Sequence, residues 1–287
     1  MQLFINALAA GSIYALVAIG FSVVYGSLRF FHFAHGAIYS TAAYAAYLTL
    51  VVMRWPPVIG VIVAVVTGTV LGLGIDLVVY RPLRRRRSSP LVLFLASLAV
   101  LGILQNLLSL LFGDQTRTLR AGIVGRGVSV FGGFITPTQI LIVILTPCVY
   151  LAVTAVSKRS RYGRLARAVA DDRELAEMLG VRLDEVALFV ITLGSALAAM
   201  AGVLVAYDTD LAPMMGFNAL LMGMVAALVG GIGSIAGAGL GGLLVGTVQN
   251  VGVWKLPASW QEAILFGLLL LFLLVRPRGI LGHPNSR

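Results

Sequence analysis

The stretch PPVIGVIVAVVTGTVLGLGIDLVVYRPLRRRRSS, residues 56–89, decides the fold class. Its apolar part is about 20 residues long, which is the length that crosses the hydrocarbon of a bilayer, and it ends in a basic cluster. Hydrophobic residues make up 59% of the 287 residues and charged residues only 11%. So little polar surface cannot cover a water-exposed globule, and the sequence therefore predicts an integral membrane protein.

Similar apolar runs, bounded by charged residues, proline or glycine clusters, recur along the chain. Nine candidate spans lie near residues 4–27, 36–53, 58–80, 90–112, 138–157, 186–207, 217–231, 234–253 and 261–275. No basic residue precedes the first run, so we expect it to stay as a transmembrane helix and not to be cleaved as a signal peptide. We predict one all-α, polytopic transmembrane bundle over residues 1–287 with about eight or nine spans, including broken helices.

The basic residues predict the orientation of this bundle. If the N-terminus lies outside and the C-terminus in the cytoplasm, 16 of the 21 Lys and Arg residues fall in the five inner segments. These are residues 28–35, 81–89, 158–185, the turn at 231–234 and the C-terminal tail. This distribution follows the positive-inside rule, and the opposite orientation would invert it. The cluster at 81–89 is then a topology determinant that touches anionic lipid headgroups. The same distribution, in short breaks between apolar runs, argues against nucleic acid as a partner despite a net charge of +10.

The longest predicted inner loop, residues 158–185, has the composition of a surface. Leu165, Val169, Leu175 and Leu179 lie at roughly helical spacing among charged residues, and Gly180 is suited to end a helix. We therefore expect an amphipathic helix, a turn and a second segment that leads into the next span. Such a helix could rest on the headgroups or fit a partner protein, and its six acidic residues favour the partner.

The segment RFFHFAHGAIY, residues 29–39, places two histidines and a glycine among aromatic residues between the first two spans. A helix broken at His35–Gly36 would expose backbone groups, which in lipid must be buried in protein or line a cavity. The alternative is that His32 and His35 anchor the chain at the inner interface. We predict that Phe33, Ala34, His35, Gly36 and Tyr39 belong to a central substrate pathway at this break, with Phe33 and Tyr39 contributing to its wall.

Other polar and small residues have plain structural interpretations. Spacings such as Gly233-x-x-x-Gly237 favour close helix packing, although the glycines at 230–233 could also shape a pathway wall or an unwound turn. The amide pairs at 105–106 and 249–250 predict hydrogen bonds between helices. We expect Cys148 to be a small buried side chain, and Asp76 to lie at the inner interface.

Signals of catalysis are absent from the sequence. Neither of the two lysines is followed by Ser or Thr, so the chain contains no G-x-x-x-x-G-K-[ST] phosphate loop. H-E-x-x-H and G-x-S-x-G motifs are also missing. We therefore expect a chain that is not an enzyme, with no catalytic residues, no metal site and no bound cofactor.

Three stretches resemble the high-affinity branched-chain amino acid permeases of the LivH/LivM family. RFFHFAHGAIYSTAAYAAY (29–47) is similar to the family's N-F-A-H-G signature, with Phe33, Ala34, His35 and Gly36 matched and a departure at Phe31-His32. RAVADDRELAEMLGVRLDEVALFVITLGSALAAMAGVL (167–204) resembles its cytoplasmic coupling segment, and VRPRGILG (275–282) its C-terminal ending. The short chain resembles LivH more than LivM.

The resemblance implies the membrane-spanning subunit of an ATP-binding-cassette importer in a prokaryotic inner membrane. It implies a second, LivM-like permease subunit, two ATP-binding subunits that use the ATP, and an extracytoplasmic substrate-binding protein. The cargo would be a branched-chain amino acid, with related amino acids, amides or urea as alternatives. Coupling to the ATPase would involve Arg167, Asp172, Glu174, Ala176 and Gly180, of which Ala176 and Gly180 have the spacing of the wider importer motif.

The main alternative is a secondary transporter or channel for small polar solutes. The scarcity of carboxylates inside the predicted spans argues against a proton-coupled version of it.

Overall fold

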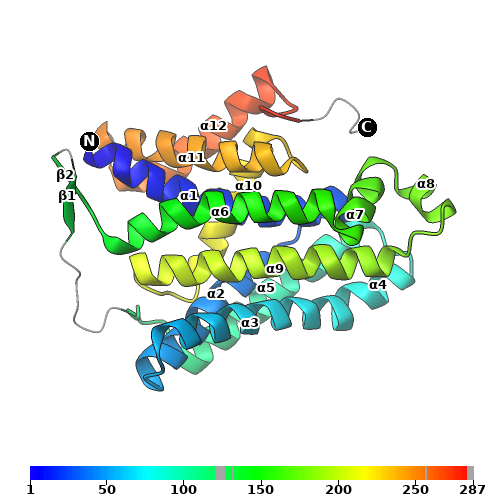
Figure 1. The fold of residues 1–287 in the computed structure, drawn as a ribbon, viewed down its shortest axis with the longest axis horizontal. Helices are drawn as coiled ribbons and strands as arrows, with labels where there is room; N and C mark the ends of the chain where they lie inside the picture. Colours follow the sequence, from blue (N-terminus) through cyan, green and yellow to red (C-terminus); the bar gives the residue numbers. More distant parts are fainter. Residues whose placement is uncertain (120–126, 131, 256, 283–287) are drawn as a thin grey trace.

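The computed structural model describes residues 1–119, 127–130, 132–255 and 257–282. Long helices lie side by side and form a bundle, and a small hairpin lies beyond one end (Figure 1). The helices are α1 (Gln2–Leu28), α2 (Ala34–Tyr47), the π-helical turn η1 (Leu48–Val52), α3 (Pro57–Ile75), the π-helical turn η2 (Asp76–Tyr80), α4 (Arg81–Arg85), α5 (Pro90–Phe112), α6 (Pro137–Arg159), α7 (Arg161–Asp171), α8 (Arg173–Met178), α9 (Leu183–Asp208), α10 (Met215–Gly230), α11 (Ile235–Lys255), the 3₁₀ turn η3 (Ala258–Trp260) and α12 (Gln261–Val275). The strands are β1 (Val128–Val130) and β2 (Gly133–Ile135).

The helical bundle predicted from the sequence is confirmed, and each of the nine predicted spans coincides with a helix. Within the described part of the chain, six helices are long and apolar enough to cross a membrane, and α10 and α12 are shorter apolar helices. The second predicted span is α2 continued by η1. Three of the long helices, α3, α5 and α6, begin with proline, whose missing N–H costs nothing in the first turn of a helix.

Helix α1 lies at the centre of the bundle. In its most apolar stretch of 18 residues, 78% is buried inside the protein, whereas the corresponding share is 28% or less for α3, α5 and α6. It packs closely on α11 through glycines, because a Cβ on Gly11 would lie 2.9 Å from the Cα of Leu243. The outer helices expose large apolar side chains such as Val66, Leu110 and Leu151, as lipid-facing helices do.

The five segments predicted to share the cytoplasmic side lie together at one end of the bundle. Arg29 donates to the Ala170 carbonyl at 2.7 Å, and the α10–α11 turn bonds to the C-terminal segment through Gly230 and Leu281. Figure 1 shows α4, α7 and α8 at this end and the N-terminus with the hairpin at the other. The segments that the sequence assigned to one side of the membrane therefore lie at one end of the structure.

Among the described residues, a short hairpin departs from the all-α prediction. Strands β1 and β2 pair in antiparallel fashion, and Gly132 has a φ of +80° in the turn between them. Gln2 ties the hairpin to the start of α1, since its side chain accepts from the Phe134 N–H at 2.7 Å and donates to the Phe134 carbonyl at 3.0 Å.

Several interpretations of small and polar residues are settled by the packing. Gly237 contacts the backbone of Gly230, so this spacing serves close packing as expected, while Gly231 and Gly233 have positive φ and form an unwound turn. Gln249 bonds across helices to Tyr14 at 2.7 Å as predicted. For Asn106 and Asn250 the prediction is wrong, because their amides donate within their own helices, to the carbonyls four residues earlier. Cys148, expected to be buried, is exposed on α6, because its position faces away from α1.

Candidate transport pathway and coupling surface

The break between α1 and α2 falls earlier than the sequence suggested. Helix α1 ends at Leu28, Arg29 takes a left-handed conformation with φ of 55°, and α2 begins at Ala34. His35 and Gly36 therefore lie in the first turn of α2, and the predicted break between them is wrong. The Gly36 N–H donates to the Phe33 carbonyl at 3.1 Å, so the N–H at the predicted break is already bonded.

Both histidines of this segment are buried in the protein. His32 is 1% exposed and His35 is 0% exposed, which contradicts their interpretation as interfacial anchors. His32 Nδ1 lies 3.0 Å from the hydroxyl of Tyr80 in the π-helical turn η2. Gly36 packs on α10, where a Cβ would lie 2.5 Å from the Gly216 carbonyl oxygen. The signature residues thus hold α2 against its neighbours.

Tyr39 is the predicted pathway residue that reaches a cavity at the hairpin end of the bundle. This cavity has a volume of about 510 Å³ and is lined from α1, α2, α6, α9, α10, α11 and α12. Phe33, Ala34, His35 and Gly36 do not line it, and Phe33 instead packs edge-on against Phe94. The polar lining residues are Asn6, Tyr14, Tyr39, Gln139, Asp208, Thr209, Asn218, Gln249, Asn250, Gln261 and Glu262.

Sequence reasoning missed most of this cavity. Tyr14 and Gln249 are far apart in the chain and belong to apolar helices, so nothing in their local pattern joins them. The hydrogen bond from the Tyr14 hydroxyl to Gln249 Oε1 closes one part of the wall. The available signal was the presence of hydroxyl and amide groups inside apolar runs, where such groups tend to face a cavity or a neighbouring helix.

The coupling segment forms two short helices. Asp172 caps α8, because its side chain accepts from the Leu175 N–H at 3.0 Å. Ala176 is the residue of α8 that is buried, at 3% exposed, whereas Glu174 lies exposed in the first turn. Gly180 has a φ of +83°, as expected for a glycine that ends a helix, and its N–H donates to the Glu177 carbonyl at 2.9 Å.

The apolar face predicted for this segment is partly wrong. Val169 packs into the bundle, but Leu175 is 49% and Leu179 76% exposed. The chain bends at Asp172, whose extended backbone separates α7 from α8, so the helical spacing does not continue from one to the other. As a result α8 projects from the bundle (Figure 1) with Leu175, Met178 and Leu179 uncovered.

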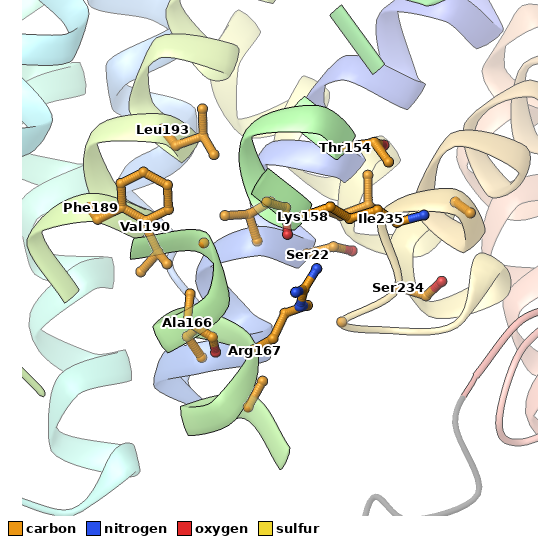
Figure 2. A pocket seen from close by; sticks show the side chains of 18 of the residues that line it. Ser22, Thr154, Lys158, Ala166, Arg167, Phe189, Val190, Leu193, Ser234 and Ile235 are labelled. Carbon is orange, nitrogen blue, oxygen red and sulfur yellow. Dashed lines mark hydrogen bonds between the residues drawn. The ribbon is translucent and has the colours of Figure 1, made fainter. Parts of the chain in front are cut away.

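Arg167 belongs to a different site from the other four predicted coupling residues. It lies on the exposed side of α7 and lines a second cavity, of about 280 Å³, at the α7 end of the bundle (Figure 2). The five predicted coupling residues therefore divide, because Asp172, Glu174, Ala176 and Gly180 shape α8 and its end whereas Arg167 belongs to this cavity.

A buried ion-pair network joins three elements at the same end. Arg84 holds Asp76 with two hydrogen bonds, of 2.6 and 3.1 Å, and also lies 3.6 Å from Asp184 at the start of α9. Asp76 is 0% exposed, so it pairs with Arg84 inside the protein, while its predicted depth at the inner interface stays a prediction. The Arg84 side chain is only 7% exposed, so part of the basic cluster faces protein and not headgroups. The π-helical turn puts Asp76 and Arg84, eight positions apart, on one side.

Comparison with known proteins decides the family. Residues 3–274 match the family described as branched-chain amino acid transport system / permease component. The chain belongs to this family. Its members include the high-affinity branched-chain amino acid transport system permease protein LivH of Salmonella typhimurium, which is 36% identical over 99% of this chain and 96% of its own length. The permease protein BraD of Pseudomonas aeruginosa is 34% identical over the same shares.

One solved structure shares the fold of this chain. The structure of PsaBC from Streptococcus pneumoniae in complex with Fab has a TM-score of 0.56 and 13% identity, covering 97% of this chain and 93% of that chain. At that identity the likeness concerns the fold alone. Family membership confirms the resemblance seen in the sequence and makes the chain a multi-pass membrane permease component.

Within the described residues, no group of three or more His, Cys, Asp or Glu side chains could hold a metal ion.

Proposed function

We propose that this permease carries branched-chain amino acids into the cell as one of two membrane subunits of an importer. Two separate ATP-binding subunits drive it, and an extracytoplasmic protein delivers the cargo. The α7–α8 end of the bundle faces the cytoplasm, with the N-terminus outside. The names of the relatives support the cargo, and the basic residues gathered at the α7–α8 end support the orientation.

The observation that carries the proposal is the surface of α8. Leu175, Met178 and Leu179 form an apolar patch beside the carboxylates of Glu174 and Glu177, on a helix that projects from the bundle. A helix that presents apolar side chains with both signs of charge around them fits a groove on a partner protein better than an anionic lipid surface. An ATP-binding subunit at the cytoplasmic end would supply that groove.

The cavity at the hairpin end supports a small zwitterionic cargo. Its wall combines hydroxyl and amide groups with apolar side chains such as Ile13, Val205 and Met222. Hydroxyls and amides can replace water around an ammonium and a carboxylate, while a branched apolar side chain needs only a dry surface. Contacts of this kind are weak, as suits a permease that must release what a binding protein delivers.

Co-purification and uptake test the proposal. The full chain, expressed with its partner subunits, should retain the ATP-binding subunits, and vesicles loaded with ATP should take up leucine, isoleucine and valine in preference to urea or a short amide. Leu175→Ser should weaken retention of the ATP-binding subunits about tenfold, since an interface anchor contributes more than about 1 kcal/mol. Leu281→Ser is the matched control, at 44% exposed and at the same end but outside α8.

Uptake that continues without any ATP-binding subunit would contradict the proposal and favour a channel or secondary transporter. Equal retention in the two serine variants would show that α8 is not the docking surface.

A further inference from the structure

The cavity at the α7 end lies between α1, α6, α7, α9 and the turn that leads into α11. Figure 2 shows the Arg167 guanidinium extending from α7 toward Ser22, with Lys158, Ser234 and Ile235 across the space. Its volume of about 280 Å³ is enough for a small headgroup but lies at the low end for a drug-sized ligand.

Three positive features face this cavity. Lys158 at the end of α6 and Arg167 on α7 both line it, and within the described parts of the chain neither forms an ion pair. The third feature is the N-terminus of α11, whose first residues Ile235 and Ala236 also line the wall. The first N–H groups of a helix lack backbone partners within the helix and carry a partial positive charge. The Ser234 hydroxyl accepts from that of Gly237 at 3.1 Å, so those of Ile235 and Ala236 are the ones that can attract an anion.

Two buried hydroxyls in the same wall have no partner. Ser22 is 1% exposed, and neither its Oγ nor the Oγ1 of Thr154 makes a hydrogen bond, although both atoms are shielded from solvent. Buried hydroxyls without partners are uncommon and cost free energy, and an acceptor oxygen held beside Lys158 and Arg167 would offer them a partner after a side-chain rotation.

An apolar groove continues from this cavity toward the other end of the bundle. It has a volume of about 510 Å³, is lined by α1, α6 and α11, and shares Tyr150 and Ala236 with the charged cavity. A Cβ on Gly239 would meet nothing closer than 3.9 Å, so the groove is open at this point.

We infer that the cavity and the groove together bind one anionic phospholipid, with its phosphate between Lys158, Arg167 and the α11 N-terminus and one acyl chain along the groove. A charged cavity that opens into an apolar groove matches a molecule with an anionic head and a long hydrocarbon chain. A free phosphate or a cargo carboxylate would share the head chemistry and leave the groove empty. The bound lipid would link α7, the first helix of the coupling segment, to α6 and α11.

This inference requires only that the chain lies in a bilayer. It does not depend on the cargo, on the orientation or on docking of an ATPase, so its failure and the failure of the proposed function are distinguishable.

Native mass spectrometry of the full chain, purified in detergent with its partner subunits, tests the site. The probes are phosphatidylglycerol and phosphatidylcholine of the same chain length. The wild type should retain phosphatidylglycerol preferentially. Lys158→Gln with Arg167→Gln should lower its retention about 30-fold, since each basic residue near an anionic headgroup contributes about 1 kcal/mol. Arg159→Gln with Arg161→Gln is the matched control, with the same loss of charge on the same segment but outside the cavity.

A second variant separates a lipid from a free anion. Gly239→Leu fills the groove without changing charge and should also lower retention of phosphatidylglycerol. Unchanged retention in Gly239→Leu, displacement of the lipid by leucine or inorganic phosphate, or equal losses in the two double variants would each overturn the lipid assignment.

Discussion

Replacing Asp76 with asparagine removes the carboxylate that Arg84 holds at the end of α3. The Asp76 side chain is 0% and that of Arg84 7% exposed, so the guanidinium would remain buried next to a neutral amide. Removing one partner of a buried ion pair costs about 3–5 kcal/mol, because the other charge stays desolvated. Asparagine keeps one acceptor and Asp184 lies 3.6 Å from Arg84, so we expect a loss near the lower limit, about 3 kcal/mol.

Thermal unfolding in detergent measures this loss. At roughly 2–4 °C per kcal/mol for a chain of this size, Asp76→Asn should lower the Tm by about 6–12 °C. The control is Glu185→Gln, which removes an exposed pair with Arg182, whose side chain is 77% exposed. Such surface pairs contribute at most about 1 kcal/mol, so the control should shift the Tm by less than about 4 °C.

A double-mutant cycle isolates the interaction. Asp76→Leu combined with Arg84→Leu removes both charges and should recover much of the stability that either single change loses, because no buried charge is left alone. Strictly additive losses in the cycle, or a Tm shift for Asp76→Asn as small as the control's, would refute the network as a stabilising element.

Three further predictions follow from single positions. Gly180→Val should impair ATP-driven uptake and its coupling to hydrolysis, because φ is +83° and a β-branched residue there is strained by about 1–2 kcal/mol from the backbone alone. Gly180→Asn, which tolerates that conformation, should transport nearly normally. Equal uptake by the two variants would contradict a role for the backbone conformation at Gly180. Gly36→Ala should destabilise the chain by about 1–3 kcal/mol in thermal unfolding, whereas Gly74→Ala, where a Cβ meets nothing within 4 Å, should be neutral. A cysteine at Ser160 in a Cys148→Ser background should stay unlabelled by an impermeant thiol reagent in intact cells; labelling there would reverse the proposed orientation.

The helices could be predicted because hydrophobicity and length alone specify them. The apolar runs that ended at proline, glycine or charged residues became helices with nearly the predicted limits, as α5 and α12 show. The positive φ of Gly180 was also expected, since glycine at a helix end has a direct conformational meaning.

The site could not be predicted as well, because it depends on contacts distant in sequence. Gly36 looked like a helix breaker, yet it lies within a helix and permits contact with Gly216 on α10. The joint lining of one cavity by Tyr14, Tyr39 and Gln249 follows from how three helices cross, which periodicity does not encode. The burial of Asp76 likewise depends on a π-helical turn that the local sequence does not announce.

The central position of α1 has a consequence for how the protein is made. This helix is synthesised well before α11, on which its Gly11 packs against Leu243. At 5–20 residues per second, synthesis of the chain between Gly11 and Leu243 takes on the order of 10–50 s. During that interval α1 waits in lipid or beside the insertion machinery with its future interface uncovered. Its mostly apolar sequence, which has no charged side chain between Gln2 and Leu28, is compatible with hydrocarbon during this interval.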